Sequence, residues 1–275
     1  MKSFDLLNEK ELIICAHRGV WGGNIPCNSS AAFEIALMQG AHMVELDVTA
    51  SADGELFVFH PGMEKRLLAK DVNIKKMPAE EVRKLRYVNL DGTETALPVP
   101  TLDSIFTQLK GRCYINVDKF WDNPKSIIEM IQKHDVKDQI VVKSPPREDV
   151  LQMIEQTAPD VQFLAIISDN HDPFEVHEML KSRNLNYVGL EVVFSKDSSP
   201  LVSREFIDKL HADGKVLWGN SILYDYRVLL AASHSDDTAL AGDPDLGWGW
   251  FADQGFDIIQ TDWPREVTLY FKNRK

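Results

Sequence analysis

The sequence predicts a single α/β domain, residues 1–275, folded as a distorted (β/α)8 TIM barrel with a small insertion after the third strand. Short apolar runs alternate with helical patterns along almost the whole chain of 275 residues. Strands that alternate with helices form parallel sheets with covering helices. The length also suits a barrel, which takes about 250 residues. An open doubly wound sheet is the alternative, but no Gly-x-Gly-x-x-Gly motif follows the first strand, which disfavours a dinucleotide-binding fold.

Strands are expected where short apolar runs lie between turn residues, and helices where apolar residues recur at helical spacing. The expected strands are Leu12–Ala16, Met43–Val48, Leu56–His60, Cys113–Asp118, Ile140–Lys143, Phe163–Ile167, Val188–Val193, Val216–Trp218 and Asp257–Gln260. The expected helices are Ser30–Gln39, Pro78–Leu85, Leu102–Leu109, Pro124–His134, Arg147–Thr157, Pro173–Arg183, Ser203–Ala212 and Trp248–Gln254. The stretch Asp225–Trp250 is expected to be a solvated acidic loop.

One connection departs from the alternation. The residues between Met43–Val48 and Leu56–His60 are too few for a crossover helix, so an antiparallel hairpin is expected there. With Asp53-Gly54 as its two-residue turn, Asp47 lies opposite His60. Glu45 shares the face of Asp47 because side chains alternate along a strand. The hairpin therefore predicts that these three side chains converge.

Composition excludes several classes of protein. Lys and Arg number 30 and Asp and Glu number 42, a formal net charge of −12, which argues against a nucleic-acid partner. No apolar stretch approaches the length of a membrane span. The three cysteines form neither a disulfide framework nor a zinc motif. The N-terminal residues lack the apolar core of a signal peptide, so a cytoplasmic protein is expected.

Polar residues gather where the expected strands end, which is where a parallel barrel places its chemistry. The first strand is followed by His17-Arg18-Gly19, and the second carries Glu45 and Asp47. The remaining strand ends give His60, Asp118, Lys119, Lys143, Glu191 and Trp218. Glu191 is either a substrate-binding residue or an ion-pair partner, and Trp218 either a wall for the substrate or a packing residue.

The acids at these ends imply a cation. Glu45, Asp47 and Asp118 cannot all be ionised at short range without one, because like charges raise pKa values. Ligands that are all oxygen suit one divalent ion, Mg²⁺ or Ca²⁺, better than zinc. His17 and His60 beside such an ion are suited to general acid and base catalysis. Arg18, Lys119 and Lys143 are suited to bind an anionic group such as a phosphate.

The stretch AHRGVWGGNIPCNSSAAFEIALMQGAHMVELDVTASADGELFVFH resembles the glycerophosphodiester phosphodiesterase family. That family shows His-Arg-Gly, Pro-Glu-Asn-Ser/Thr, Glu-x-Asp-Val, Asp-Gly and a strand ending in His-Asp. The resemblance continues in INVDKFWDNP and GFDIIQTDWP. It implies a small-molecule phosphodiester substrate and a role in glycerol and lipid metabolism. It further implies a cap formed by residues 61–101 that selects the alcohol. The residues implied are the metal ligands Glu45, Asp47 and Asp118, the acid–base pair His17 and His60, and the phosphate contact Arg18.

Four residues depart from the family pattern. Cys27 stands where the family has Glu, and Pro61 where Asp follows the second histidine. Asp118 stands for the commoner Glu, with Lys119 directly after it. Loss of the glutamate is expected to leave Arg18 freer and to change the preferred head group or weaken activity.

The leading hypothesis is a metal-dependent hydrolase that converts a glycerophosphodiester to glycerol phosphate and an alcohol. The alternatives are a related phosphodiesterase or cyclising lyase that acts on a sugar or inositol diester, and a catalytically weak phosphodiester-binding barrel. A glycosidase with Glu45 and Asp118 as its acids leaves both histidines without a function.

Overall fold

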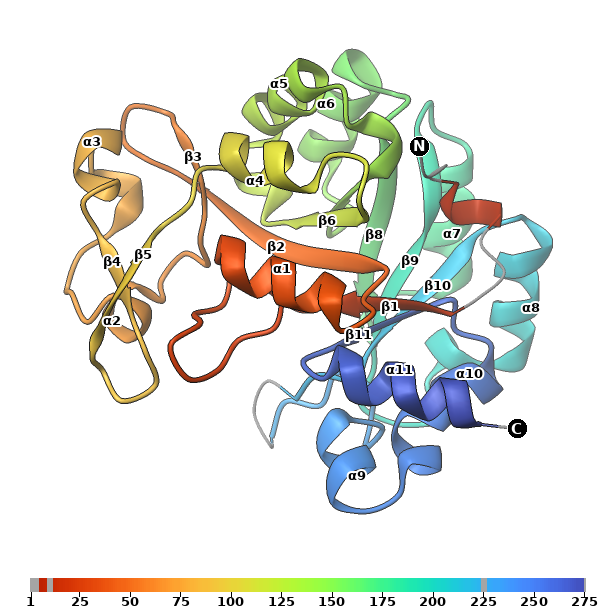
Figure 1. Ribbon diagram of the computed structural model, residues 1–275. Coiled ribbons are helices and arrows are strands. Elements are labelled where there is room, and N and C mark those ends of the chain that lie inside the picture. Colours follow the sequence, from red (N-terminus) through yellow and green to blue (C-terminus); the bar gives the residue numbers. More distant parts are fainter. Residues whose placement is uncertain (1–4, 9–11, 224–226, 275) are drawn as a thin grey trace.

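The computed structural model describes residues 5–8, 12–223 and 227–274, and shows a closed ring of eight parallel strands. The first strand pairs with both the last and the second, which closes the ring (Figure 1). The predicted barrel is therefore confirmed. The strands of the ring are β1 (Ile13–Ala16), β2 (Met43–Ala50), β6 (Tyr114–Asp118), β7 (Ile140–Ser144), β8 (Gln162–Ser168), β9 (Asn186–Val193), β10 (Val216–Asn220) and β11 (Ile258–Thr261).

Helices surround this ring, most of them at the predicted positions. They are α1 (Ser30–Met38), α4 (Leu102–Leu109), α5 (Pro124–His134), α6 (Glu148–Thr157), α7 (Pro173–Lys181), α8 (Arg204–Ala212), α9 (Asp236–Ala241), α10 (Trp250–Gln254) and α11 (Pro264–Asn273). The helix α11 had not been predicted. The expectation of a loop over Asp225–Trp250 is wrong at 236–241, where α9 lies. The first two residues of that stretch, 225 and 226, lie outside the described residues. There the Ser235 hydroxyl accepts a hydrogen bond from the Thr238 amide and caps α9.

The predicted hairpin exists, but its register is shifted by one residue. Strand β3 (Leu56–Val58) runs antiparallel to β2 outside the ring, and Ala50 pairs with Leu56. The Phe59 amide, and not His60, bonds to the Asp47 carbonyl. The connection is a longer loop closed by a hydrogen bond from the Ser51 amide to the Glu55 carbonyl. A two-residue turn at Asp53-Gly54 is therefore wrong. The loop is longer because the Asp53 carboxylate accepts hydrogen bonds from the Ser51 hydroxyl and the Ala79 amide.

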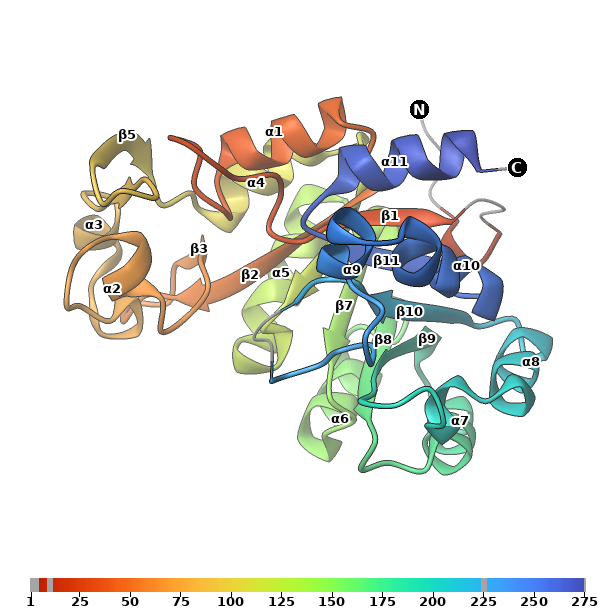
Figure 2. The same ribbon diagram turned by 90° about the horizontal axis from the view of Figure 1, so that it is seen from below.

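The segment between β3 and α4 forms a cap that projects from one side of the ring (Figures 1 and 2). It contains α2 (Glu64–Leu67), α3 (Ala79–Val82) and the antiparallel pair β4 (Arg86–Val88) and β5 (Glu94–Pro98). Helix α3 is the observed part of the helix predicted over Pro78–Leu85 and covers no barrel strand. The cap buries its own apolar cluster, which includes Phe57, Phe59 and Tyr87. It is thus built around a core separate from that of the barrel.

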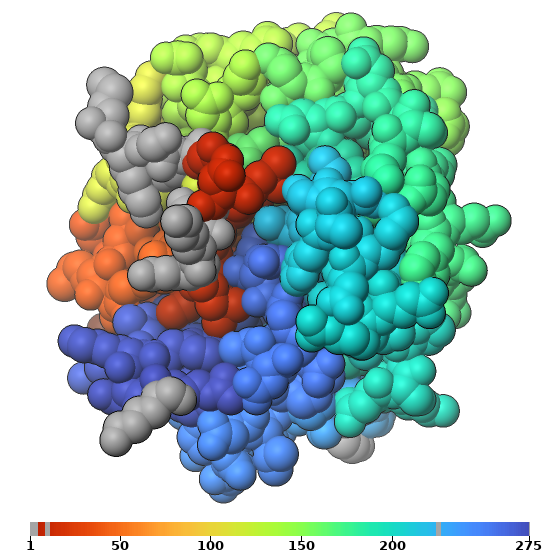
Figure 3. All heavy atoms as spheres, turned by 90° about the vertical axis from the view of Figure 1, so that its right-hand side faces the viewer, coloured from red at the N-terminus to blue at the C-terminus, as the bar shows by residue number. Residues whose placement is uncertain are grey.

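The amino-terminal end of the ring is filled. Leu6 is buried against the first residues of the strands, among them Ile13, Val216 and Ile258. The Asp5 amide donates a hydrogen bond to the Tyr114 hydroxyl. Figure 3 shows the N-terminal segment in the middle of this face, between the C-terminal and central parts of the chain. The barrel is therefore closed here, and only the opposite end is available for a site. No helix among the described residues is long and apolar enough to cross a membrane.

The contact between β9 and β10 requires a glycine. A Cβ atom at Gly189 would overlap the backbone carbonyl of Val216 and lie 2.7 Å from its Cγ2. We expect Gly189→Ala to lower the free energy of unfolding by about 1–3 kcal/mol, because the strands must separate to admit the methyl group. Urea denaturation followed by circular dichroism measures this. An unchanged unfolding midpoint would show that the sheet absorbs the extra atom without strain.

Candidate active site

Three carboxylates meet at the carboxyl end of β2 and β6. Glu45 and Asp47 lie on the same face of β2, and Asp47 is paired across the sheet with Asp118 of β6. A ligand oxygen from each of the three lies within 4.8 Å of the others. Glu45 and Asp47 are fully buried, and Asp118 is partly buried. The structure therefore brings together the acids that the sequence indicated.

This acid cluster fits a hard divalent cation. The buried oxygens Asp47 Oδ1 and Asp118 Oδ1 have no hydrogen-bond partner in the described part of the chain. Burial, with the nearby charge of Asp47, raises the pKa of Glu45 to about 7. Buried carboxylate oxygens without donors are costly unless a cation lies between them, and hard cations prefer such ligands. The chemistry of these residues thus fits a hard divalent cation.

Residues after β1 hold two of these acids in place. The Arg18 amide donates a hydrogen bond of 3.0 Å to the Glu45 carboxylate, and the Arg18 Nε lies 2.9 Å from Asp47 Oδ2. Asn28 has a positive φ of 56° and donates from its side chain to Asp47 Oδ2 at 2.8 Å. Arg18 therefore has a carboxylate partner in Asp47, and the effect of Cys27 on activity stays a prediction.

Both predicted catalytic histidines face the acid cluster with one ring nitrogen already engaged. His17 Nδ1 lies 2.9 Å from the carboxylate of Asp262, and His60 Nδ1 lies 2.9 Å from the carbonyl of Pro61. A carboxylate and a carbonyl only accept, so each Nδ1 carries the proton. His60 Nε2 lies 3.9 Å from Asp47 Oδ1. In both rings Nε2 is therefore the nitrogen left for chemistry, and the shifted hairpin register does not move His60 away from Asp47.

The environments of the two histidines differ. Burial lowers the pKa of His17, but the hydrogen bond to Asp262 and the charge of Glu45 outweigh it, so the net shift is upward. Burial, with the charges of Arg18 and Lys119, lowers the pKa of His60. Opposite shifts in two imidazoles at one site are typical of an acid–base pair.

The two lysines at this end are placed differently. Lys119 is partly exposed, and its Nζ lies 3.1 Å from Asp118 Oδ2. Lys143 is buried, with Nζ 3.1 Å from Glu191 Oε2 and 5.2 Å from the centre of the Trp218 ring. The charges of Glu191 and Asp118 raise the pKa of Lys143 despite burial. Lys143 is thus a fixed positive charge beside the acids.

Glu191 and Trp218 lie inside the barrel rather than at its mouth. Glu191 accepts a hydrogen bond from the Asn220 side chain at 2.9 Å, and Trp218 is fully buried in the lower cluster of barrel side chains. Both residues contact Lys143. A substrate-binding role for either residue stays a prediction.

Sequence reasoning missed two residues of the site, Asp262 and Asp236. Asp262 follows β11, and its carboxylate accepts a hydrogen bond from His17. Asp236 is buried and accepts hydrogen bonds from the Asp262 amide and from three side chains, Ser221, Trp248 and Thr261. The position of Asp262 directly after a strand was a sequence signal for a role in the site. The sequence holds no such signal for Asp236, because its hydrogen-bond donors come from distant parts of the chain.

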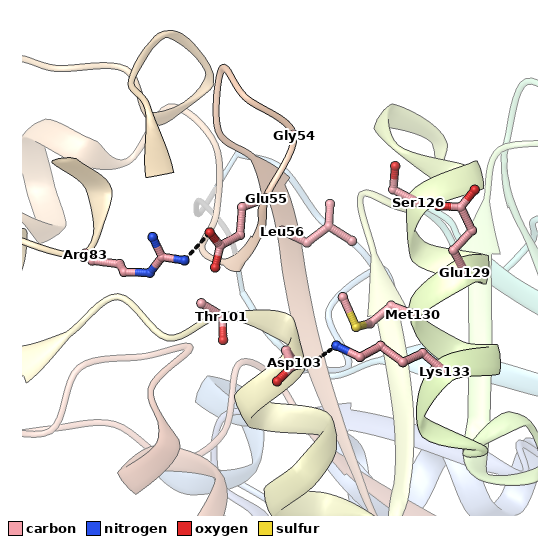
Figure 4. A pocket seen from close by; sticks show the side chains of 10 residues that line it. All are labelled: Gly54, Glu55, Leu56, Arg83, Thr101, Asp103, Ser126, Glu129, Met130 and Lys133. Atoms are coloured by element: carbon pink, nitrogen blue, oxygen red, sulfur yellow. Dashed lines mark hydrogen bonds and ion pairs between the residues drawn. The ribbon is translucent and has the colours of Figure 1, made fainter. Parts of the chain in front are cut away.

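A hollow of about 640 Å³ lies away from the acid cluster, between the β2–β3 loop, α4 and α5 (Figure 4). Its charged side chains are largely paired with one another: Arg83 with Glu55, and Lys133 with Asp103. The hollow contains no histidine and no set of converging acids, so it is not the candidate active site.

Comparisons with known proteins agree with this geometry. The chain is 26% identical over 218 residues to a glycerophosphodiester phosphodiesterase of Bacillus altitudinis, which covers 74% of this chain and 83% of that protein. A glycerophosphoryl diester phosphodiesterase structure from Parabacteroides distasonis superposes with a TM-score of 0.77 and 19% identity, over 97% of this chain and 90% of that one. A phosphodiesterase structure from Oleispira antarctica gives a TM-score of 0.69 and 19% identity, over 95% and 97% of the two chains. A family model described as a domain of unknown function matches residues 163–271.

The fold is thus a TIM barrel with acids and histidines at one end, and solved phosphodiesterase structures share this fold along almost the whole chain. Within that fold, the chain is similar over most of its length to proteins named glycerophosphodiester phosphodiesterase.

Proposed function

We propose that this chain is a metal-dependent enzyme that hydrolyses a glycerophosphodiester to glycerol phosphate and an alcohol. The observation that carries the proposal is the convergence of three buried carboxylates with two histidines that each leave Nε2 available. The names of the relatives support it, as does the Oleispira antarctica structure, which is a complex with the product sn-glycerol-3-phosphate.

Glu45, Asp47 and Asp118 would hold one Mg²⁺ or Ca²⁺ ion. When bound, such an ion withdraws charge from a non-bridging phosphoryl oxygen. Arg18 and Lys119 lie against the same acids and supply donors for the remaining phosphate oxygens. Lys143, paired with Glu191, keeps a positive charge beside the acids and favours their ionised form.

The two histidines move the protons. The Nε2 of one histidine accepts a proton from the attacking hydroxyl, and the Nε2 of the other donates a proton to the leaving oxygen as its bond to phosphorus breaks. We propose that the first attacking group is the neighbouring hydroxyl of the glycerol, since an intramolecular attack gains from proximity. The reaction then passes through a cyclic phosphate that water opens to glycerol phosphate.

Removal of either the ion or a histidine tests this function. We expect hydrolysis of glycerophosphodiesters in the presence of Mg²⁺ or Ca²⁺, and loss of hydrolysis with EDTA. We expect His60→Ala to lower kcat about 10²–10⁴-fold, which is the usual contribution of a positioned acid or base. Phosphorus NMR measures the products and shows whether a cyclic phosphate persists.

The matched control is His211→Ala. This histidine also pairs with an aspartate, Asp257, but lies near the start of β11, at the opposite end of the barrel. Its variant should keep the wild-type rate. Turnover that survives His60→Ala, or that is indifferent to EDTA, would contradict the proposed mechanism.

A further inference from the structure

A hollow of about 190 Å³ lies between the cap and the loop that joins β1 to α1. Arg18 and Cys27 line its inner end. Because Arg18 is the proposed phosphate contact, the hollow is placed to receive a group carried by the phosphate. Its volume is enough for a small alcohol.

The walls of this hollow are mainly apolar. Trp21 and Ile25 contribute from the loop, and Leu67, Val88 and Leu90 from the cap. At the inner end, burial raises the pKa of the Cys27 thiol to about 12, so the thiol is neutral. An apolar group gains free energy on entering such a space, whereas a charged group loses hydration there.

The charged side chains that line the hollow are both basic. Arg18 and Arg66 line it, and none of its described lining residues is acidic. Asp47 partly balances Arg18, whereas Arg66 is exposed and makes no ion pair with any residue that the structure describes. A quaternary ammonium group is bound by aromatic faces and nearby acids. Here Trp21 offers one ring, and the arginines repel the cation.

We propose that this hollow binds the leaving alcohol, and that it selects an uncharged apolar alcohol over a quaternary ammonium alcohol of the same shape. The proposal rests on the phosphodiesterase function and names the substrate class for it. Selection arises from the cap and the β1–α1 loop together, since each contributes apolar residues and one of the two arginines.

Two glycerol phosphodiesters of equal shape test the selection. One carries choline, and the other carries 3,3-dimethylbutanol, in which a neutral carbon replaces the ammonium nitrogen. We expect kcat/KM to be at least tenfold higher for the neutral diester. We expect Arg66→Glu to shift this ratio at least tenfold toward choline, because it replaces a repelling charge with an attracting one.

Lys65→Glu is the matched control. It makes the same charge change at the neighbouring exposed residue, which does not line the hollow, and it should leave the ratio unchanged. A choline diester cleaved as fast as its neutral counterpart would overturn the proposal, and so would a ratio that Arg66→Glu does not move.

A binding measurement separates this proposal from the proposed function. Calorimetry gives the affinities of 3,3-dimethylbutyl phosphate and phosphocholine without any turnover. Tighter binding of the neutral ester, reversed by Arg66→Glu, supports the proposed selection by the hollow. If neither diester is hydrolysed, that result leaves the selection standing and contradicts only the proposed hydrolytic function. Equal affinities, or tighter binding of phosphocholine, contradict the selection whatever the rates are.

Discussion

Replacing Asp262 with Asn is expected to lower kcat for glycerophosphodiester hydrolysis about 10²–10⁴-fold. The Asp262 carboxylate fixes the proton of His17 on Nδ1 and leaves Nε2 directed to the reaction. An amide that donates to Nδ1 favours the opposite tautomer, in which Nε2 carries the proton and cannot accept one at any step of the reaction. Loss of a carboxylate behind a catalytic histidine has an effect of this size. Steady-state kinetics at several pH values measures it.

The double variant His17→Ala/Asp262→Asn should be no slower than His17→Ala alone, because residues that act as one unit are not additive. Asp257→Asn is the control at the other end of β11. Its carboxylate holds His211 and the Leu217 amide, so its loss should affect stability and not turnover. Additive losses for His17 and Asp262 would show that the two do not act together.

Replacing Asp236 with Ala is expected to lower the free energy of unfolding by about 3–5 kcal/mol. Four donors lose their acceptor at once: the Ser221 and Thr261 hydroxyls, the Trp248 indole and the Asp262 amide. A buried donor without a partner costs about 1–3 kcal/mol, and partial rearrangement reduces the sum. Chemical denaturation measures the loss. Asp237→Ala, an exposed neighbour on α9, should cost less than about 0.5 kcal/mol.

The pH dependence of this effect has a definite sign. Burial raises the pKa of Asp236 to about 6, above its ordinary value of 3.8. Between those values the folded protein binds a proton that the unfolded chain has released, so stability falls as the pH rises from about 4 to 6. The alanine variant lacks this contribution, and the stability gap between it and the wild type should therefore widen as the pH is lowered. A constant gap would mean that Asp236 titrates normally.

The order of strands and helices could be predicted from the sequence because it depends on local periodicity. Apolar runs of strand length and helical spacing lie along the chain itself, and the rule that parallel strands end together then collects the polar residues at one edge. Glu45, Asp47, Asp118, His17 and His60 were identified in this way. The last helix, α11, and the short α9 were missed, although Ser235 and Pro264 stand where a helix start is typical.

Only the tertiary structure decided which residues support this set. The hairpin register changed because Asp53 bonds to the cap, which no local turn rule includes. Asp47 lies beside Arg18. Asp236 accepts hydrogen bonds from Ser221 just after β10, from Trp248 just before α10 and from Thr261 of β11. The sequence by itself determined the barrel and which polar side chains gather at one end of it. Hydrogen bonds and charges between segments far apart in the chain determined their protonation, their partners and the shape of the hollow, because those interactions depend on distances that appear only when the ring closes.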